Sequence, residues 1–252
     1  IFETDKNPVA CVALHVDLVL NHMANESGQR SDLDYPGTRV LALYAGNPQA
    51  AQSSRLFGDL TQNLFSAADF NEARCIGNYN DVFQVQNWRL CGGGGDRGLP
   101  DLAGSARVIG LQREYLRALR QLGVDGFRID AAKHMTLDHL NGAFSGDVRA
   151  GAFVFGELIT AGGAGNLDYQ PAPPPHLAGT DHAAYDFPLF HAIRGAFAFG
   201  ARLDALVDPL AAGQALPGAR AVTFTVTHDI PNNQGFRGLL LDPVDETLAY
   251  AF

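Results

Sequence analysis

Short apolar runs, separated by polar and glycine-rich stretches, dominate the pattern of this chain. The first run, residues 12–20, is nearly continuous and rich in valine and leucine, as expected for a parallel strand that is covered on both faces. Two later runs, residues 126–129 and 152–156, have the same character, and each is followed directly by an acidic residue. Two more runs predict strands: residues 185–189 and 221–227.

Helical periodicity appears between the apolar runs. Ser105 is a suitable N-cap, and Gly123 stands where a C′ glycine belongs. Apolar residues between them recur at the spacing of a core-facing helix: Val108, Leu111, Tyr115, Leu119 and Leu122. Further helices are predicted after Thr136, over residues 191–206 and from near Asp245. A loop rich in glycine and proline is expected over residues 161–180.

The segment between residues 23 and 98 differs in character from the rest. It is rich in Asn, Asp, Ser and Gly, contains a run of glycines at residues 92–95, and is too long for an ordinary connection between a strand and a helix. Large apolar residues are spread along it: Phe57, Leu64, Phe65, Phe83 and Trp88. We therefore expect a small inserted domain, irregular and partly β, rather than disorder.

The order of these elements predicts an α/β fold. Strands that alternate with helices form a parallel sheet, and an acidic residue at several successive strand ends is typical of the mouth of a (β/α)8 TIM barrel. An open doubly wound sheet is the weaker alternative, because no glycine-rich phosphate loop follows any of the strands. The barrel is expected to be incomplete at both ends, with the insertion after its third strand.

Composition and charge narrow the possible partners. The chain has 252 residues, of which 46% are hydrophobic, and its net charge of −9 comes from 18 Lys and Arg against 27 Asp and Glu. Without a basic run, a nucleic-acid partner is not expected. No apolar run is long enough to span a bilayer, so no membrane partner is expected. The chain begins without Met, almost within a strand, and we interpret it as a fragment.

Ionisable side chains cluster where the strand over residues 126–129 ends. Because side chains alternate between the faces of a strand, Arg128 and Asp130 share one face. A neighbouring guanidinium favours the ionised form of the Asp130 carboxylate, which suits a nucleophile or an electrostatic stabiliser. Lys133 and His134 follow closely. A purely structural ion-pair cluster is the alternative, but desolvating such charges costs several kcal/mol unless each is paired.

Four segments resemble, in order, the signature segments of the α-amylase family. They are residues 17–22 (DLVLNH), 126–134 (GFRIDAAKH), 156–158 (GEL) and 227–229 (THD). Residues 99–102 (LPDL) resemble the fifth segment, and residues 80–87 resemble an insert of actinobacterial and animal members. The resemblance runs from the third to the seventh barrel strand, as for part of the catalytic domain of a secreted bacterial α-amylase.

The resemblance implies a glycoside hydrolase that cleaves internal α-1,4-glucosidic bonds of starch-like α-glucans with retention. Such chemistry needs an ionised nucleophile and a protonated acid, roughly 5 to 5.5 Å apart. Asp130 suits the nucleophile. Glu157 suits the acid, because Phe153 and Phe155 on its own parity are expected to raise its pKa. Asp229 would stabilise the transition state.

The resemblance also implies a set of residues around the sugar. These substrate-binding candidates are His22, Arg128, Lys133, His134 and His228. A lone histidine is more often a satisfied core residue, so the motif context carries this assignment. Asp17 is expected to support the mouth of the barrel rather than to perform chemistry.

Calcium is the cofactor that the resemblance implies. A hard cation takes six to eight oxygen ligands. Asn21 and Asp101 resemble the family's side-chain ligands, and the backbone carbonyls of Gln86 and His134 resemble its main-chain ligands. The alternative is that Asn21 and Asp101 are ordinary turn residues.

Three cysteines bear on the fold: Cys11, Cys75 and Cys91. Cys11 is expected to be a small buried residue, whereas Cys75 and Cys91 bracket a loop-rich segment and either bridge or stay reduced. Related sequences carry the second cysteine near the position of Trp88, so the family's bridge is shifted or absent here. Thr227 replaces an Asn of chloride-dependent relatives, which argues against a chloride site.

Taken together, the residues divide the chain into three parts. Residues 1–22 would be a barrel segment, residues 23–102 an inserted calcium-binding subdomain, and residues 103–252 the barrel from its third helix to its seventh strand and the following helix. Expected partners are starch, amylose and maltooligosaccharides, and a secreted monomer is implied. The alternatives are an exo-acting maltooligosaccharide hydrolase, a transglycosylase, or a non-catalytic amylase-like binding protein.

Overall fold

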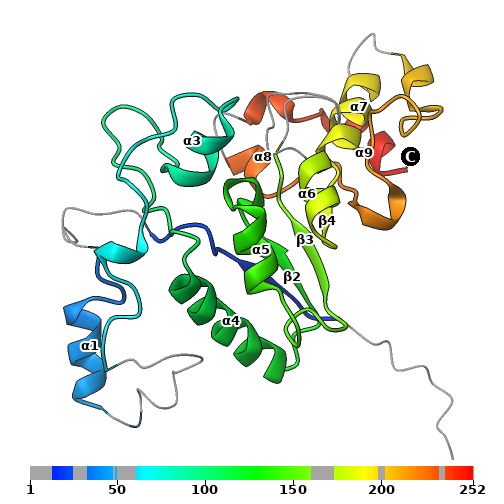
Figure 1. Ribbon diagram of the computed structural model, residues 1–252. Helices are drawn as coiled ribbons and strands as arrows, with labels where there is room; N and C mark the ends of the chain where they lie inside the picture. Colours follow the sequence, from blue (N-terminus) through cyan, green and yellow to red (C-terminus); the bar gives the residue numbers. More distant parts are fainter. Residues whose placement is uncertain are drawn as a thin grey trace, which may run out of the picture.

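The computed structural model describes residues 13–24, 33–47, 49, 61–159, 173–197, 202–232 and 236–251 (Figure 1). Its strands are β1 (His15–Leu18), β2 (Gly126–Ile129), β3 (Phe153–Gly156), β4 (Ala183–Tyr185) and β5 (Ala221–Val222). Its α-helices are α1 (Thr38–Ala45), α3 (Val82–Asn87), α4 (Ala106–Gln121), α5 (Leu137–Ala143), α6 (Pro173–Gly179), α7 (Phe187–Phe197), α8 (Asp229–Asn232) and α9 (Pro243–Ala251). Short 3-10 helices are η1 (Ala67–Asp69), η2 (Ala132–His134), η4 (Leu203–Leu206), η5 (Gly218–Arg220) and η6 (Arg237–Leu239).

The strands form one parallel sheet in chain order, β1-β2-β3-β4-β5. Helices connect successive strands, so every strand points the same way and all the carboxyl ends meet at one edge. This arrangement confirms the predicted α/β class with a parallel sheet. Within the described ranges, β1 and β5 are the two edges of the sheet, as expected for part of a barrel that is not closed.

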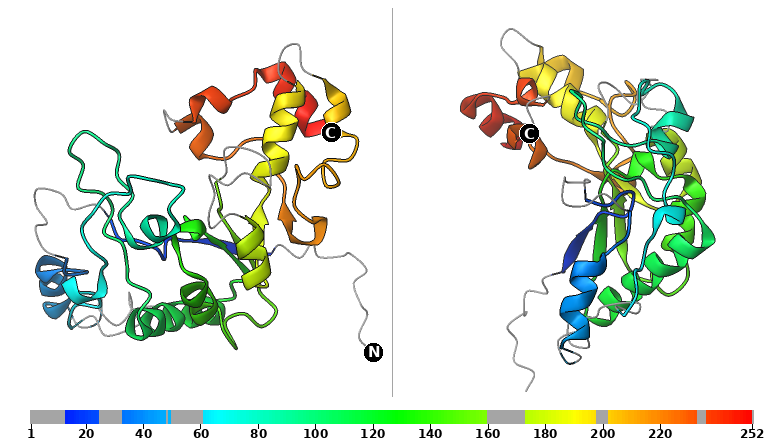
Figure 2. Two further views of the ribbon diagram at one scale, coloured as in Figure 1. Left: turned by 45° about the horizontal axis from the view of Figure 1, so that its top comes forward. Right: turned by 90° about the vertical axis from the view of Figure 1, so that its left-hand side faces the viewer.

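Helices α4, α5 and α6 cover one face of this sheet (Figure 2). The core between them is apolar, and Phe127 and Ile129 of β2 are fully buried against Leu116 of α4 and Leu140 of α5. Burying each such side chain contributes about 1.5–3 kcal/mol. Because alternate residues face the opposite side, Arg128 projects from the other face of the sheet, towards the interior of the incomplete barrel.

Helix α4 confirms the clearest of the helical predictions. Ser105 is its N-cap, and its hydroxyl accepts a hydrogen bond from the amide of Val108 at 3.2 Å. Gly123 has a φ of 91° two residues beyond the helix, a left-handed conformation that glycine adopts without strain. The apolar face of α4 therefore packs against the sheet as the periodicity indicated.

The described residues between 33 and 102, which are 33–47, 49 and 61–102, form loops and short helices. Their β structure consists of isolated bridges, such as Tyr35 with Phe65 and Cys75 with Arg89, rather than named strands. A small core of their own packs on α4, with Tyr35 and Phe65 buried against Val108. The expected irregular character is thus present in the described part, with less β structure than predicted.

Several predicted element boundaries were wrong near the carboxyl end of the sheet. Residues 185–189 are not a strand, because β4 ends at Tyr185 and α7 begins at Phe187. The buried Asp186 carboxylate accepts a hydrogen bond from the Leu189 amide at 2.9 Å, as an N-cap does. Pro188 is compatible with this first turn, where a missing N–H is not needed.

The helix over residues 191–206 and the strand over residues 221–227 were also only partly right. Helix α7 ends at Phe197, and residues 203–206 form the 3-10 helix η4. Strand β5 has two residues because Ala221 and Val222 pair with Ala184 and Tyr185, where β4 ends, and a strand lasts only as far as its ladder of hydrogen bonds. The loop predicted over residues 161–180 contains the helix α6.

Some predictions fall on residues outside the described ranges. These are Cys11, the first residue of the run at 12–20, Phe57, and most of the loop before α6. Among the helices that the structure does describe, none combines the length and the apolar character that crossing a bilayer requires.

Candidate active site

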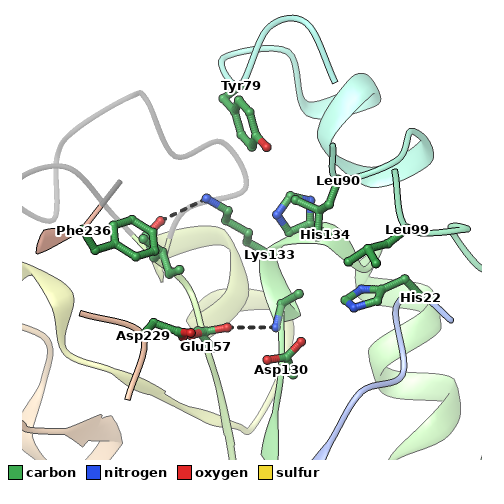
Figure 3. Close-up of a pocket in the computed structure, with 12 residues that line it drawn as sticks. His22, Tyr79, Leu90, Leu99, Asp130, Lys133, His134, Glu157, Asp229 and Phe236 are labelled. Carbon is green, nitrogen blue, oxygen red and sulfur yellow. Dashed lines mark hydrogen bonds between the residues drawn. The ribbon is translucent and has the colours of Figure 1, made fainter. Parts of the chain in front are cut away.

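A pocket of about 550 Å³ lies at the carboxyl edge of the sheet (Figure 3). Its wall is made by residues from the strand ends, from the segment 79–99 and from the region after β5. The residues that line it are His22, Tyr79, Leu90, Leu99, Asp130, Ala131, Lys133, His134, Glu157, Ile159, Asp229 and Phe236. The three carboxylates predicted from the sequence therefore share one cavity.

Arg128 connects the carboxylates of the site, although it is not one of the residues that line the pocket. One guanidinium nitrogen donates to both oxygens of Asp17 at 2.6 and 2.7 Å and to Asp130 at 3.2 Å. The other terminal nitrogen lies 2.8 Å from Oε1 of Glu157. Burial disfavours the charged guanidinium, but the three carboxylates outweigh burial and raise the pKa of Arg128. Arg128 thus stays a fixed positive charge among Asp17, Asp130 and Glu157.

Glu157 lies directly after the last residue of β3 and is 5% exposed. Burial raises its pKa, while Arg128 and a hydrogen bond from the backbone of Ala131 lower it, and Asp130 and Asp229 raise it again. The net effect is a raised pKa. A carboxyl group that holds its proton to higher pH is suited to act as a general acid, so the predicted direction is confirmed.

Ala131 separates Asp130 from η2 in a left-handed conformation, with φ 49° and ψ 34°. Its amide donates a hydrogen bond to Oε2 of Glu157 at 3.1 Å. A residue with a Cβ adopts this region only at an energetic cost. The turn therefore aims a backbone donor from the end of β2 at the carboxyl group that follows β3.

Asp229 approaches the pocket from the other side, as the first residue of α8. Figure 3 shows its carboxylate beside that of Glu157. His228 precedes it, with 62% of its side chain exposed and Nε2 3.6 Å from Oδ2 of Asp229. His228 is not part of the pocket wall, so the structure does not bring this substrate-binding candidate together with the others.

Lys133 crosses the upper part of the pocket. Its ammonium group donates to the carbonyl of Ile159 at 3.3 Å and lies 5.4 Å from the centre of the Tyr79 ring. Burial lowers the pKa of Lys133 to about 8, against the opposing charge of Glu157. In Figure 3 the side chain lies between Tyr79 and Phe236, so its charge faces the cavity rather than the solvent.

Two histidines complete the wall near β1. Burial lowers the pKa of His22, although the charge of Asp130 raises it in part. His134 is buried, with Nδ1 2.9 Å from the carbonyl of Val85, and burial lowers its pKa to about 3. Both imidazoles are therefore neutral near neutral pH and able to donate to or accept from hydroxyl groups.

The side-chain candidates for calcium also meet. Asn21 and Asp101 are both buried, and the amide of Asn21 donates to Oδ1 of Asp101 at 3.0 Å. Asn71, which the sequence reading missed, donates to the other carboxylate oxygen at 2.7 Å. Burial raises the pKa of Asp101 to about 7, and these hydrogen bonds and Arg89 lower it only in part. A nearby cation would stabilise the ionised form of such a buried carboxylate.

The main-chain candidates lie on the seam between α3 and η2. The Gln86 side chain donates to the carbonyl of Met135 at 3.2 Å, and His134 contacts the carbonyl of Val85, so the two backbone segments are held together. Within the described ranges, no three His, Cys, Asp or Glu side chains group as a metal site.

The structure resolves the question of the cysteines. Cys75 and Cys91 form a disulfide, with their Cα atoms 5.6 Å apart. The bridge lies beside the pocket segment, because Leu90 precedes Cys91 and its carbonyl accepts a hydrogen bond from the Leu99 amide at 2.9 Å. Leu90 and Leu99 both line the pocket. The shifted bridge thus holds part of its wall.

Several pocket residues were not predicted from the sequence. These are Tyr79, Leu90, Leu99, Ala131, Ile159 and Phe236. Most lie in segments without regular periodicity, where neither spacing nor charge indicates that a side chain faces the cavity.

Comparisons with known proteins identify relatives of this chain. No family model matches the chain. It is 53% identical over 241 residues to an α-amylase of Aeromonas hydrophila, covering 96% of this chain and 52% of that protein. It is 31% identical over 257 residues to an α-amylase-related protein of Drosophila varians, covering 96% of this chain and 46% of that protein. The chain thus spans about half the length of the curated relatives it matches.

Solved structures show the same fold. The crystal structure of α-amylase I from Eisenia fetida matches 95% of this chain and 47% of its own, with a TM-score of 0.69 and 24% identity. A mutant of that enzyme has been solved in complex with maltohexaose. Three findings point to the same family: the parallel sheet of barrel type, the signature segments at its strand ends, and the extensive identity to a bacterial α-amylase. The chain belongs to the α-amylase family of glycoside hydrolases.

Proposed function

We propose that the protein hydrolyses internal α-1,4-glucosidic bonds of starch-like α-glucans with retention of configuration. The observation that carries this proposal is the meeting of Asp130, Glu157 and Asp229 in one pocket, with Glu157 buried and its pKa raised. Two carboxyl groups with different environments are what a retaining glycosidase requires. The complex of the Eisenia fetida enzyme with maltohexaose supports an α-glucan as the ligand class.

The first chemical step would be carried by Asp130 and Glu157. Asp130, held by Arg128 at 3.2 Å, attacks the anomeric carbon while Glu157 gives its proton to the departing glycosidic oxygen. The bond to the leaving sugar breaks, and a covalent glycosyl-enzyme ester forms. Arg128 remains charged throughout, and it offsets the negative charge that Glu157 acquires.

The second step reverses these roles. Glu157, now ionised, takes a proton from water, the hydroxide attacks the anomeric carbon, and Asp130 is released as a carboxylate. Asp229 would stabilise the positive charge that develops on the sugar ring in both steps. Two displacements at one carbon restore the original configuration, so the product is the α-anomer.

Sugar hydroxyls would be held by His22, Lys133 and His134 in the pocket wall, and His228, which does not line the pocket, would contact the sugar from outside this wall. The neutral imidazoles can exchange donor and acceptor roles with hydroxyl groups. Lys133 would contact the leaving-group side, where Tyr79 and Phe236 offer apolar surface for a pyranose face. Arg128 would act on the reaction indirectly, by pairing with the carboxylates of Asp130 and Glu157.

Calcium would be held by Asn21 and Asp101 with the carbonyls of Gln86 and His134. When bound, the ion supplies a structural charge that ties the segment after β1 to the loops above it. An antiparallel bridge between His22 and Asp101 already joins these two segments. Residues 23–102 would then be the inserted calcium-binding subdomain, between barrel segments at residues 1–22 and 103–252.

Two other activities belong to the same site. An exo-acting hydrolase or a transglycosylase would use the same carboxylates, and a cyclomaltodextrin glucanotransferase matches the fold with a TM-score of 0.66 at 22% identity. A non-catalytic binding protein would be expected to lack one of the three carboxylates, and all three are present. Secretion and a monomeric state would follow from the family, with starch, amylose and maltooligosaccharides as partners.

The test combines product analysis with one substitution. The unaltered protein should convert amylose to a mixture of short oligosaccharides whose new reducing ends appear as the α-anomer in proton NMR. Glu157→Gln should lower kcat by several orders of magnitude and leave maltooligosaccharide binding intact, because the amide keeps the shape but cannot protonate the leaving oxygen. Near-normal turnover by Glu157→Gln would overturn the proposal, and release of a single short product would favour the exo-acting alternative.

A further inference from the structure

Two histidines lie packed together on the outer side of the sheet, behind the strand end that leads to Glu157. His176 in α6 is 2% exposed, and His182, directly before β4, is 1% exposed. Their ring centroids are 5.8 Å apart. Nε2 of His176 and Nδ1 of His182 are buried without a hydrogen-bond partner. Because unpaired buried polar atoms are unfavourable, the presence of these two rings in the interior needs a reason beyond packing.

The His176 ring contacts the chain next to the catalytic carboxyl groups. Gly156, which precedes Glu157, has no room for a side chain, because a Cβ would lie 2.8 Å from Cβ of Ala132 and 3.2 Å from Cε1 of His176. Ala132 is the second residue after Asp130. The imidazole and the Ala132 methyl group therefore pack against the same point of the β3 backbone, and together they occupy the space that a side chain would fill.

The surroundings keep both rings uncharged. Burial lowers the pKa of His176 to about 4, its backbone bond with Ala183 opposes this, and Arg220 lowers it further. Burial also lowers the pKa of His182 to about 3; His176, Arg149 and Arg220 add to this, and Asp181 opposes it. Arg220 donates to the carbonyl of His182 at 2.8 Å, so a positive charge borders the pair.

We propose that His176, backed by His182, is a positioning residue that sets the separation of the Asp130 and Glu157 carboxyl groups. It would do so by holding Ala132 and Gly156 at a fixed distance from α6. The inference rests on the proposed function, because carboxylate separation matters only for a reaction between them. Protonation at acid pH would place a charge in this apolar space and displace the ring, so turnover would be lost through geometry.

The test compares two substitutions at one position. His176→Ala should lower kcat on amylose about tenfold or more with KM within about twofold, because a misplacement of about 1 Å can cost a hundredfold in rate. His176→Gln fills much of the same space and does not titrate in this range. It should retain kcat within about threefold near neutral pH, and its midpoint of acid-induced loss of near-UV circular dichroism should lie about half a pH unit lower or more.

Leu116→Ala is the matched control, because Leu116 is equally buried in α4 and is not one of the residues that line the pocket. It should lose thermal stability and keep its kcat. Normal kcat in a folded His176→Ala protein, or an unshifted acid midpoint in His176→Gln, would overturn the inference while the proposed function stands. If His176→Ala does not fold, the acid midpoint of His176→Gln decides. An unaltered protein that cleaves no α-glucan would overturn the proposed function and the inference with it.

Discussion

Arg128 pairs with three carboxylates, and replacing it should make the stability of the protein fall with rising pH. We consider Arg128→Met, which keeps the length of the side chain and removes its charge. The guanidinium and the Glu157 carboxyl group have side chains only 8% and 6% exposed. At about 4 Å and an effective dielectric constant of about 20, such a pair interacts by roughly 4 kcal/mol. That corresponds to an upper limit of about three units in the pKa of Glu157.

The sign of the pH dependence follows from proton binding. Without Arg128, the folded-state pKa of Glu157, which burial already raises, would rise further above its unfolded value. A group of this kind stabilises the fold below the unfolded value and loses that contribution as the pH rises through the folded value. Breaking a buried pair costs about 3–5 kcal/mol in total. The deficit of Arg128→Met should therefore be smallest near about pH 4.5 and should grow towards about pH 8.

Urea denaturation of the unaltered protein and Arg128→Met at several pH values measures this deficit. Asp17→Asn is the matched control, because the Asp17 side chain is 52% exposed although it contacts the same guanidinium. Loss of the Asp17 charge should lower the free energy of unfolding by less than about 1 kcal/mol. A deficit of Arg128→Met that does not change with pH, or that is no larger than that of Asp17→Asn, would refute the reasoning.

Two further predictions concern the metal and acid stability. Exhaustive chelation should lower the thermal midpoint and the starch-degrading activity together, because a ligand that binds the native state stabilises it by mass action. Adding calcium should restore both. Unchanged melting, with no calcium found by elemental analysis, would rule out the calcium site. The buried histidines should make the free energy of unfolding fall as the pH drops from about 6.5 to about 4, because the unfolded chain binds protons that the folded rings exclude. The fall should be up to about 1.4 kcal/mol per pH unit for each ring. His139, whose pKa burial lowers to about 4, provides the check, since urea titrations of His139→Gln should show a shallower fall.

The sequence predicted best the elements whose partners are close and regular. Helix α4 carries its own N-cap, its apolar stripe and its terminal glycine, so nothing outside residues 105–123 was needed to find it. The face shared by Arg128 and Asp130 followed from strand alternation alone. The start of α7 was missed because Phe187 and Leu189 were read as strand residues, although Asp186 and Pro188 together are a start signal for a helix.

Features that depend on distant parts of the chain could not be predicted. The length of β5 is decided by its neighbour β4, and residues 223–227 contain no sign of where that ladder ends. The catalytic candidates were found because each follows a strand, whereas Tyr79 and Phe236 reach the pocket from irregular segments. The contact of His176 with Gly156 joins residues 20 positions apart through the packing of α6 on the sheet. The choice between a bridged and a reduced Cys75 likewise depended on a distance in space.

At the left-handed turn of Ala131, a change that raises the stability of the fold is expected to slow turnover. An alanine in this conformation stores about 1–2 kcal/mol of strain that a glycine would release. In the described ranges, Ala131 is the only non-glycine residue with a positive φ. It is therefore the position that would be chosen to raise thermal stability by introducing glycine. A glycine keeps this amide but lets the turn adopt more conformations, so the hydrogen bond to Oε2 of Glu157 would be held less firmly and, on the proposed function, turnover would be slower. Thermostability in this protein is better sought on the outer helices, away from the carboxyl ends of the strands.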